Sequence, residues 1–329
     1  MRFGELLAAV PAWTGAPLTN WPVGPRLVAA FILGAVVGLL LRAWLARLAT
    51  PVDQLAASGL VRAERRWKTA AGPYGLLEGV TAAVFVVYFA MTTLLAAQRL
   101  PEEGHPDWFG YRLLLHLVLL AILIAATWID LWEYIIPDEL VVAGLLTAVA
   151  LHAGVNHVHL VPLWIDWNLE HPITGPYIPE WMKSSPVGHG LSVALVGALV
   201  AAIGTWLLRV LSGWMLGQEA LGFGDVTLMA MIGAVIGWQA ALWILLLAPL
   251  CGLLAALAVW LSSGRVALPY GPCLAAATFV VLCTWKWLWI PSRLIFGHLP
   301  SLVGLVAVAV GLLIALLTLV RGVRSLPTR

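Results

Sequence analysis

The chain has few charged residues and hardly any cysteine. Only 10% of its 329 residues are charged, whereas 62% are hydrophobic and the mean hydropathy is +0.96. Soluble domains carry roughly 25% charged residues, so the composition excludes a protein with an ordinary polar surface. The net charge of +2 is small, and no basic stretch alternates with aromatic residues as in a single-strand binding groove. We therefore expect no nucleic-acid partner.

Motifs for metals and for activated nucleophiles are also missing. Cys251, Cys273 and Cys283 lie in or beside apolar runs without a Cys-x-x-Cys pair, whereas thiolate metal sites need close pairs. The histidines of residues 152–189 include a single His-x-His pair, which is a weak metal signal. No Gly-x-Ser-x-Gly or His-Glu-x-x-His motif occurs. These absences predict unreactive thiols and no bound metal.

Long apolar runs dominate what the sequence does contain. A bilayer core about 30 Å thick needs roughly 20 apolar residues per helical span, and such runs recur along the chain. They predict an all-α, polytopic membrane protein. The sixth run is short, so Gly237-Trp238-Gln239 must form the turn into the seventh. The nine predicted spans are 27–48, 76–97, 112–130, 139–156, 187–209, 226–237, 239–261, 270–291 and 301–320.

The distribution of Lys and Arg between the loops predicts the orientation. With the N-terminus outside, eleven Lys or Arg residues lie on the cytoplasmic side and six on the outer side. Cytoplasmic loops of membrane proteins carry the excess of positive residues. The sequence therefore predicts an outer N-terminus and a cytoplasmic C-terminus.

Four acids lie at the ends of predicted spans, all on the cytoplasmic side. They are Glu78, Asp130, Asp138 and Asp225. Ionisable groups at membrane depth are costly and are candidates for function. Each of the four acids could instead have a plain structural role.

A structural role accounts for some of these acids better than for others. Asp138 follows Pro137 and fits a helix N-cap. Asp225 could also be a cap, but Gly222 and Gly224 are more than a cap requires and would let a peptide backbone approach the carboxylate. A structural role explains Asp130 least well, because a carboxylate at a helix C-terminus opposes the macrodipole.

Two aspartates from different helices can share one proton and perform acid–base chemistry. Such a pair can activate water toward a peptide carbonyl and protonate the leaving nitrogen. This reaction needs no metal, serine nucleophile or cofactor. The alternative class is a proton- or ion-coupled transporter or a membrane scaffold, in which acids usually lie near the midplane in broken helices.

The residues around these acids resemble the type IV prepilin peptidases. Two segments match the family's Ile-Asp…Pro-Asp-x-Leu and Gly-x-Gly-Asp blocks, and two weaker matches flank them. Presenilin-type enzymes share Gly-x-Gly-Asp, but their Pro-Ala-Leu element is absent here. In chain order the four segments are Tyr74-Gly-Leu-Leu-Glu-Gly-Val-Thr81, Ile129-Asp-Leu-Trp-Glu-Tyr-Ile-Ile-Pro-Asp-Glu-Leu140, Gly222-Phe-Gly-Asp225 and Leu268-Pro-Tyr-Gly-Pro-Cys-Leu274.

The resemblance implies a function and a site. It makes Asp130 and Asp225 the catalytic pair, with Glu78, Asp138, Gly222 and Gly224 as supporting residues. The activity would be removal of the leader peptide from type IV prepilins or type II secretion pseudopilins at the bacterial cytoplasmic membrane, without a cofactor. S-adenosylmethionine would be needed only if the family's N-methyltransferase activity is retained.

The resemblance also implies a division of the chain into three regions. It implies an N-terminal span with a reduced basic cytoplasmic loop (1–70), a peptidase-like core (71–292) with an outer insertion (157–186), and a ninth, additional span with a basic tail (293–329).

The sequence departs from the family pattern in two ways. The family's large loop with two Cys-x-x-Cys pairs is missing. Thr227 stands where the family has Lys, so we expect no cation beside the pair. Asp225, at a helix N-terminus, is then expected to be ionised and Asp130 protonated.

Overall fold

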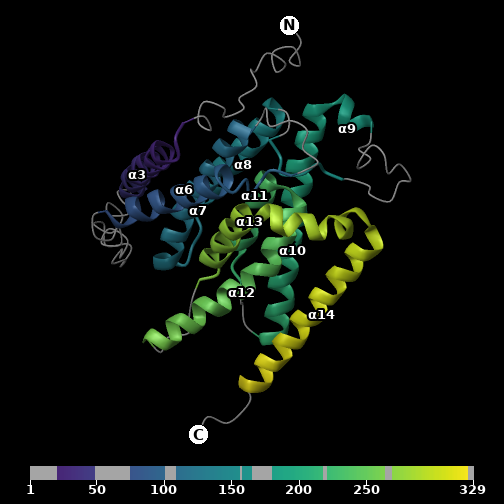
Figure 1. The fold of residues 1–329 in the computed structure, drawn as a ribbon. Helices are drawn as coiled ribbons and strands as arrows, with labels where there is room; N and C mark the ends of the chain where they lie inside the picture. The colour runs from purple at the N-terminus through teal and green to yellow at the C-terminus, as the bar shows by residue number, and fades with distance from the viewer. Residues whose placement is uncertain are drawn as a thin grey trace.

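In a computed structural model, the protein is a bundle of helices (Figure 1). The structure describes residues 21–48, 75–100, 109–155, 158–164, 180–217, 221–263 and 269–324. The predicted basic loop, most of the outer insertion and the end of the basic tail lie outside these ranges. The helices are α3 (Val23–Leu48), α6 (Leu76–Thr93), α7 (Phe109–Glu133), α8 (Asp138–Gly154), α9 (Glu180–Ser184), α10 (Pro186–Leu216), α11 (Phe223–Ile236), α12 (Trp238–Ser263), α13 (Gly271–Gly297) and α14 (Leu299–Arg324).

All nine predicted spans are helices, which confirms the all-α, polytopic class. Within the described residues, six helices are long and apolar enough to cross a membrane by length and composition, namely α3, α6, α7, α10, α12 and α13. Helix α11 has 14 residues and is therefore about 21 Å long, shorter than a bilayer core. The count of nine spans stays a prediction.

Two span boundaries depend on backbone conformation. Helix α6 ends at Thr93 rather than at the predicted residue 97, and Ala96 has a φ of 50° just beyond it. At the other boundary, Gly237 has a φ of 85° between α11 and α12. A positive φ is costly for residues other than glycine. The turn predicted over Gly237-Trp238-Gln239 is therefore confined to Gly237, because Trp238 and Gln239 already belong to α12.

Helix α11 lies inside the bundle (Figure 1). It contacts α7, α8, α10, α12 and α13, and nearly all of its residues from Asp225 to Ile236 are buried. A helix that is apolar all round belongs in a protein core. Because α11 begins beside Asp225, this packing carries one predicted catalytic residue into the interior.

Small residues allow two helix pairs to approach closely. A Cβ added at Gly34 would lie 2.6 Å from the Cα of Ala82, and one at Gly38 would lie 2.6 Å from the Cα of Glu78. These contacts join α3 to α6. A side chain at Gly197 in α10 would collide with the carbonyl oxygen of Gly233 in α11. Closely spaced small residues therefore set the packing, as is common in membrane helices.

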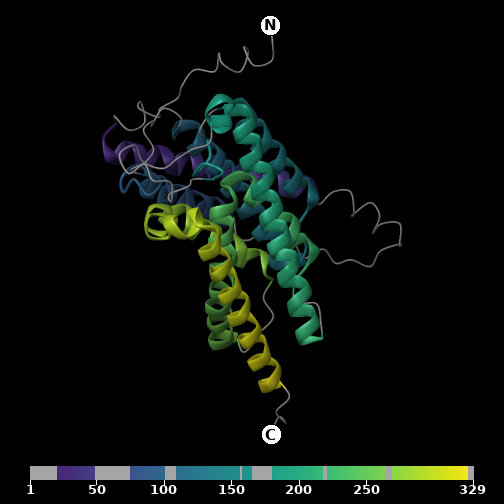
Figure 2. The same ribbon diagram turned by 90° about the vertical axis from the view of Figure 1, so that its right-hand side faces the viewer.

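Three helices extend beyond the rest of the bundle. In both views, α10, α12 and α14 run toward the C-terminal end of the molecule (Figures 1 and 2). Their outer faces carry exposed apolar side chains, including Leu199, Leu254 and Val303. Exposed leucine and valine along whole helices suit contact with lipid.

Residues 158–164 pack on the bundle through their backbone carbonyls. Arg112 Nε donates to Val158 O at 3.2 Å, and Trp238 Nε1 donates to Leu163 O at 2.7 Å. Gln239 Nε2 adds a bond to Pro162 O at 2.9 Å. Side chains of α7 and of the first turn of α12 therefore hold this segment against the bundle.

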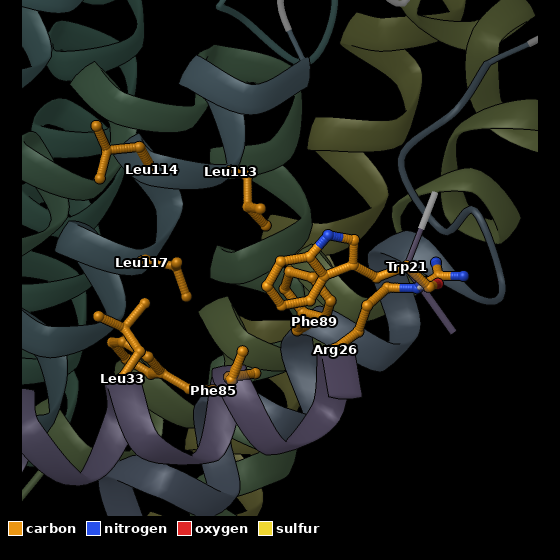
Figure 3. Close-up of a pocket in the computed structure, with 10 residues that line it drawn as sticks. Trp21, Arg26, Leu33, Phe85, Phe89, Leu113, Leu114 and Leu117 are labelled. Carbon is orange, nitrogen blue, oxygen red and sulfur yellow. Dashed lines mark hydrogen bonds between the residues drawn. The ribbon is translucent and has the colours of Figure 1, made fainter. Parts of the chain in front are cut away.

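A cavity of about 150 Å³ lies between α3, α6 and α7. Figure 3 shows Trp21, Phe85, Phe89 and Leu117 around it. Arg26 also reaches the cavity, and its Nε donates to Trp21 O. The other lining residues are apolar, and none of the four acids borders it. This cavity is therefore separate from the predicted site.

We expect Gly197→Ala to destabilise the bundle, because the new methyl group would strike the Gly233 carbonyl. Overpacking of this kind costs about 1–3 kcal/mol, so the apparent Tm in detergent should fall by several degrees. The matched control is Gly304→Ala in α14, where no atom lies within 4 Å of an added Cβ. It should leave Tm unchanged or slightly higher. Equal effects of the two substitutions would refute close α10–α11 packing.

Candidate active site

Asp225 lies in the first turn of α11 and is buried. Only 6% of the residue is exposed. Gly222, in an extended conformation, precedes the helix, and its N–H donates to Asp225 Oδ2 at 2.9 Å. Asp225 is therefore not the N-cap. Its carboxylate instead reaches back to a backbone donor at the helix N-terminus, where negative charge is stabilised.

Asp130 lies in the last turn of α7 and is 5% exposed. Its carboxylate accepts the backbone N–H of Gly271, the first residue of α13. A side chain at position 271 would collide with Asp130 Oδ2. The sequence placed only Asp225 at a helix N-terminus. The structure places Asp130 against a second one, so the expected contrast between the two carboxylates is largely removed.

The two aspartates lie close enough to interact. The charge of Asp130 acts on Asp225, and both carboxylates act on the thiol of Cys273 in the first turn of α13. Helices α7, α11 and α13 contact one another and bring the groups together from positions 95 residues apart in the sequence (225 minus 130). The structure thus contains two buried carboxylates, each with one backbone N–H donor.

A cation lies beside this pair, contrary to expectation. Arg209 of α10 is among the charges that act on Asp225. Its Nε donates to Leu221 O at 3.1 Å, and its Cζ lies 6.0 Å from the centroid of the Phe223 ring. The prediction of no nearby cation was wrong because the charge comes from another helix. Thr227 instead bonds within α11, to Gly224 O at 3.0 Å.

Glu78 and Asp138 occupy other positions. Arg42 Nη2 of α3 donates to Glu78 Oε2 at 2.8 Å, and the two residues form an ion pair, so Glu78 joins α3 to α6. Asp138 is exposed and is the first residue of α8, with Pro137 as N-cap and no side-chain cap bond. The capping prediction for Asp138 was wrong, since Pro137 has an extended ψ of 131° and supplies the N-cap itself.

The structure adds residues that sequence reasoning did not single out. Gly271 and Tyr270 belong to the fourth family-like segment, which gave no individual assignment. Ile136 lies in the turn between α7 and α8, and its side chain faces both Gly224 and Gly271. Nothing in the apolar pattern distinguishes Ile136 from its neighbour Ile135. Among the described residues, no group of three or more His, Cys, Asp or Glu side chains could hold a metal.

Comparisons with known proteins find a family match over part of the chain. Residues 182–257 match the Type IV leader peptidase family, and this segment includes Gly222, Gly224 and Asp225. A type 4 prepilin-like proteins leader peptide-processing enzyme of Escherichia coli is 35% identical over 202 residues, covering 61% of this chain and 58% of that protein. No solved structure matches the chain.

Two further relatives carry the name prepilin leader peptidase/N-methyltransferase. The protein of Pectobacterium carotovorum is 32% identical over 175 residues, covering 53% of this chain and 49% of its own. That of Aeromonas salmonicida is 30% identical over 176 residues, covering 53% and 50%. The chain thus spans about half the length of the curated relatives it matches. The resemblance predicted from the sequence is confirmed: the chain is similar to the type IV leader peptidases, and residues 182–257 carry the family match.

Proposed function

We propose that the protein is a membrane aspartyl endopeptidase that removes the leader peptide of type IV prepilins or type II secretion pseudopilins. The observation that carries the proposal is the pair of buried carboxylates, Asp130 and Asp225, each bonded to a glycine N–H. The names of the relatives support the substrate class. An ion-coupled transporter has no comparable support.

In the proposed reaction the two aspartates share one proton. The ionised carboxylate takes a proton from water, whose oxygen adds to the scissile carbonyl carbon, while the protonated carboxyl donates to the carbonyl oxygen. The tetrahedral intermediate then collapses: the carboxyl that took the proton from water gives it to the leaving nitrogen, the C–N bond breaks, and a hydroxyl proton of the intermediate returns to the other aspartate. The two backbone N–H donors are already in position before the reaction, so they need not reorganise during it. Proteolysis by this route needs no cofactor, and S-adenosylmethionine would serve only an N-methyltransferase activity.

We further propose the bacterial cytoplasmic membrane as the location, with the N-terminus outside and the C-terminus inside. The distribution of Lys and Arg supports this orientation. It places the aspartate pair at the cytoplasmic face, where the basic leader of a membrane-anchored precursor would meet it. The peptidase-like core would span residues 71–292, with 157–186 as an outer insertion and 293–329 as an additional span.

Asp130→Asn and Asp225→Asn should each reduce cleavage by about 10²-fold to 10⁴-fold, because acid–base catalysis of that size needs both carboxyls. The assay is co-expression with a prepilin, with removal of the leader scored by mass. Asp138→Asn is the matched control, since Asp138 is an exposed acid near the same helix ends. If Asp130→Asn or Asp225→Asn still cleaves the precursor substantially, the substituted aspartate has no part in the mechanism.

Gly271→Ala should be far more damaging to activity than Gly222→Ala. A methyl group at 271 would strike Asp130 Oδ2, whereas one at 222 would lie 3.6 Å from Asp225 Oδ2, an ordinary contact. Initial rates of leader removal, normalised to the amount of protein in the membrane, would measure the difference. If Gly222→Ala proves the more harmful, the arrangement of Asp130 against α13 is incorrect.

Arg209→Gln should move the acid limb of the pH–activity profile to higher pH. Loss of the positive charge near Asp225 makes the pair hold its proton more tightly, so the ionised form is reached only at higher pH. Arg209→Lys should shift the limb less because the charge is kept, although the forked contacts of the guanidinium are lost. An unchanged profile in Arg209→Gln would show that Arg209 acts only by holding the turn at Leu221.

A further inference from the structure

The cavity between α3, α6 and α7 lies at the other end of the bundle from the aspartate pair. Leu113, which borders the cavity, is near the start of α7, whereas Asp130 is in the last turn of the same helix. They are 17 residues apart (130 minus 113), which corresponds to about 26 Å along the axis, nearly the thickness of a bilayer core. A ligand in this cavity would therefore not touch the aspartates.

The cavity has a buried apolar floor and opens toward lipid. Phe85, Phe89 and Leu113 line it and are buried. Leu33 and Leu114 also line it, but they are 46% and 44% exposed, as leucines that face a bilayer are. An apolar cavity of about 150 Å³ takes up hydrocarbon rather than water. The volume and lining of this cavity therefore suit a segment of a hydrocarbon chain.

A cation stands at one end of the cavity. Arg26, in the first turn of α3, is the charged residue among those that line it. Figure 3 shows Arg26 beside Trp21 near one end, with Leu33 and Leu114 toward the other, and Arg26 Nε donates to Trp21 O. Arg and Trp at the end of a span are typical of the membrane interface. From Arg26 the cavity thus extends toward Leu33, about 10 Å deeper along α3.

We propose that this cavity binds one phospholipid from the leaflet opposite the aspartate pair, with the phosphate on Arg26 and part of one acyl chain in the cavity. A guanidinium has five N–H donors in a planar fork that matches phosphate, and the bond to Trp21 uses one of them. A free phosphate would leave the apolar floor uncovered, and an uncharged apolar molecule would not engage Arg26. A phospholipid matches both features, and this role is independent of the proposed peptidase function.

The test uses a phosphatidylglycerol with a diazirine in one acyl chain. It is added in trace amount to the full chain in maltoside micelles, which contain no phosphate. On illumination the diazirine loses N₂ and the carbene inserts into a C–H bond that it touches, and peptide mass spectrometry locates the label. The measured quantity is the labelling of the buried floor (Phe85, Phe89 and Leu113) relative to that of Leu254, an exposed residue of α12. A lipid that only surrounds the protein reaches Leu254 but not the floor.

The wild type should label at the floor, and Arg26→Gln should reduce this labelling about 10-fold or more, because a hydrogen bond to a charged group is lost. Arg26→Lys should retain part of it, since the charge is kept without the fork. The matched control is Arg293→Gln near the end of α13, since Arg293 is also half-buried but does not line the cavity. It should leave the labelling unchanged.

Two further comparisons separate the phosphate contact from the chain contact. Ala29→Leu adds three carbons to a residue that lines the cavity and should reduce floor labelling, whereas Ala43→Leu, at an exposed position of the same helix outside the cavity, should not. A diacylglycerol with the same diazirine chain lacks the phosphate. It should label the floor of the wild type about 10-fold less than phosphatidylglycerol does.

Several results would overturn the proposal. One is the lack of floor labelling in the wild type. Equal labelling by diacylglycerol and phosphatidylglycerol, or wild-type labelling in Arg26→Gln, would show that hydrocarbon enters the cavity without a phosphate contact. A loss in Arg293→Gln or Ala43→Leu as large as in the variant that each controls would show that the effect is not specific to the cavity. Each of these results would leave the peptidase function untouched.

Discussion

The structure depends on the way an apolar helical bundle accommodates two buried carboxylates. Burial of an unpaired charge is very costly, and here each carboxylate receives a backbone N–H at the start of a helix. Gly222 serves Asp225 within α11, and Gly271 of α13 serves Asp130 across a helix contact. The second bond requires glycine, because a Cβ at position 271 would occupy the place of Asp130 Oδ2. Only the second contact joins two helices, α7 and α13, and it does so beside the start of α11.

The remaining helices support that arrangement. Contact between Gly197 and Gly233 brings α10 against α11, so that Arg209 of α10 can bond the turn before α11. Glu78 and Arg42 form the corresponding ionic contact between α3 and α6. The acids near the membrane boundary therefore divide into two classes. Asp130 and Asp225 lie close enough to interact, whereas Glu78 joins two helices and Asp138 is exposed. The predicted position of an acid at the membrane interface did not by itself show to which class it belongs.

The sequence predicted the helices well because apolar runs of sufficient length have few alternatives in lipid. It also marked Asp130 and Asp225, since the local pattern around each is unusual. It could not predict that the positive charge of Arg209 acts on Asp225, because that charge comes from a different helix. It could not predict that Gly271 donates to Asp130, which depends on how α7 and α13 pack. The capping prediction for Asp138 failed because Pro137 provides the N-cap instead.

Cross-linking can show whether Asp130 and Asp225 face each other. In a background with Cys251→Ala, Cys273→Ala and Cys283→Ala, the double substitution Asp130→Cys with Asp225→Cys should cross-link on oxidation or with a short bifunctional thiol reagent. The comparison is Asp138→Cys with Asp225→Cys, in which one thiol lies on the exposed start of α8. We expect rapid cross-linking of the first pair and little of the second. Cross-linking of the second pair without the first would show that Asp130 and Asp225 do not face each other.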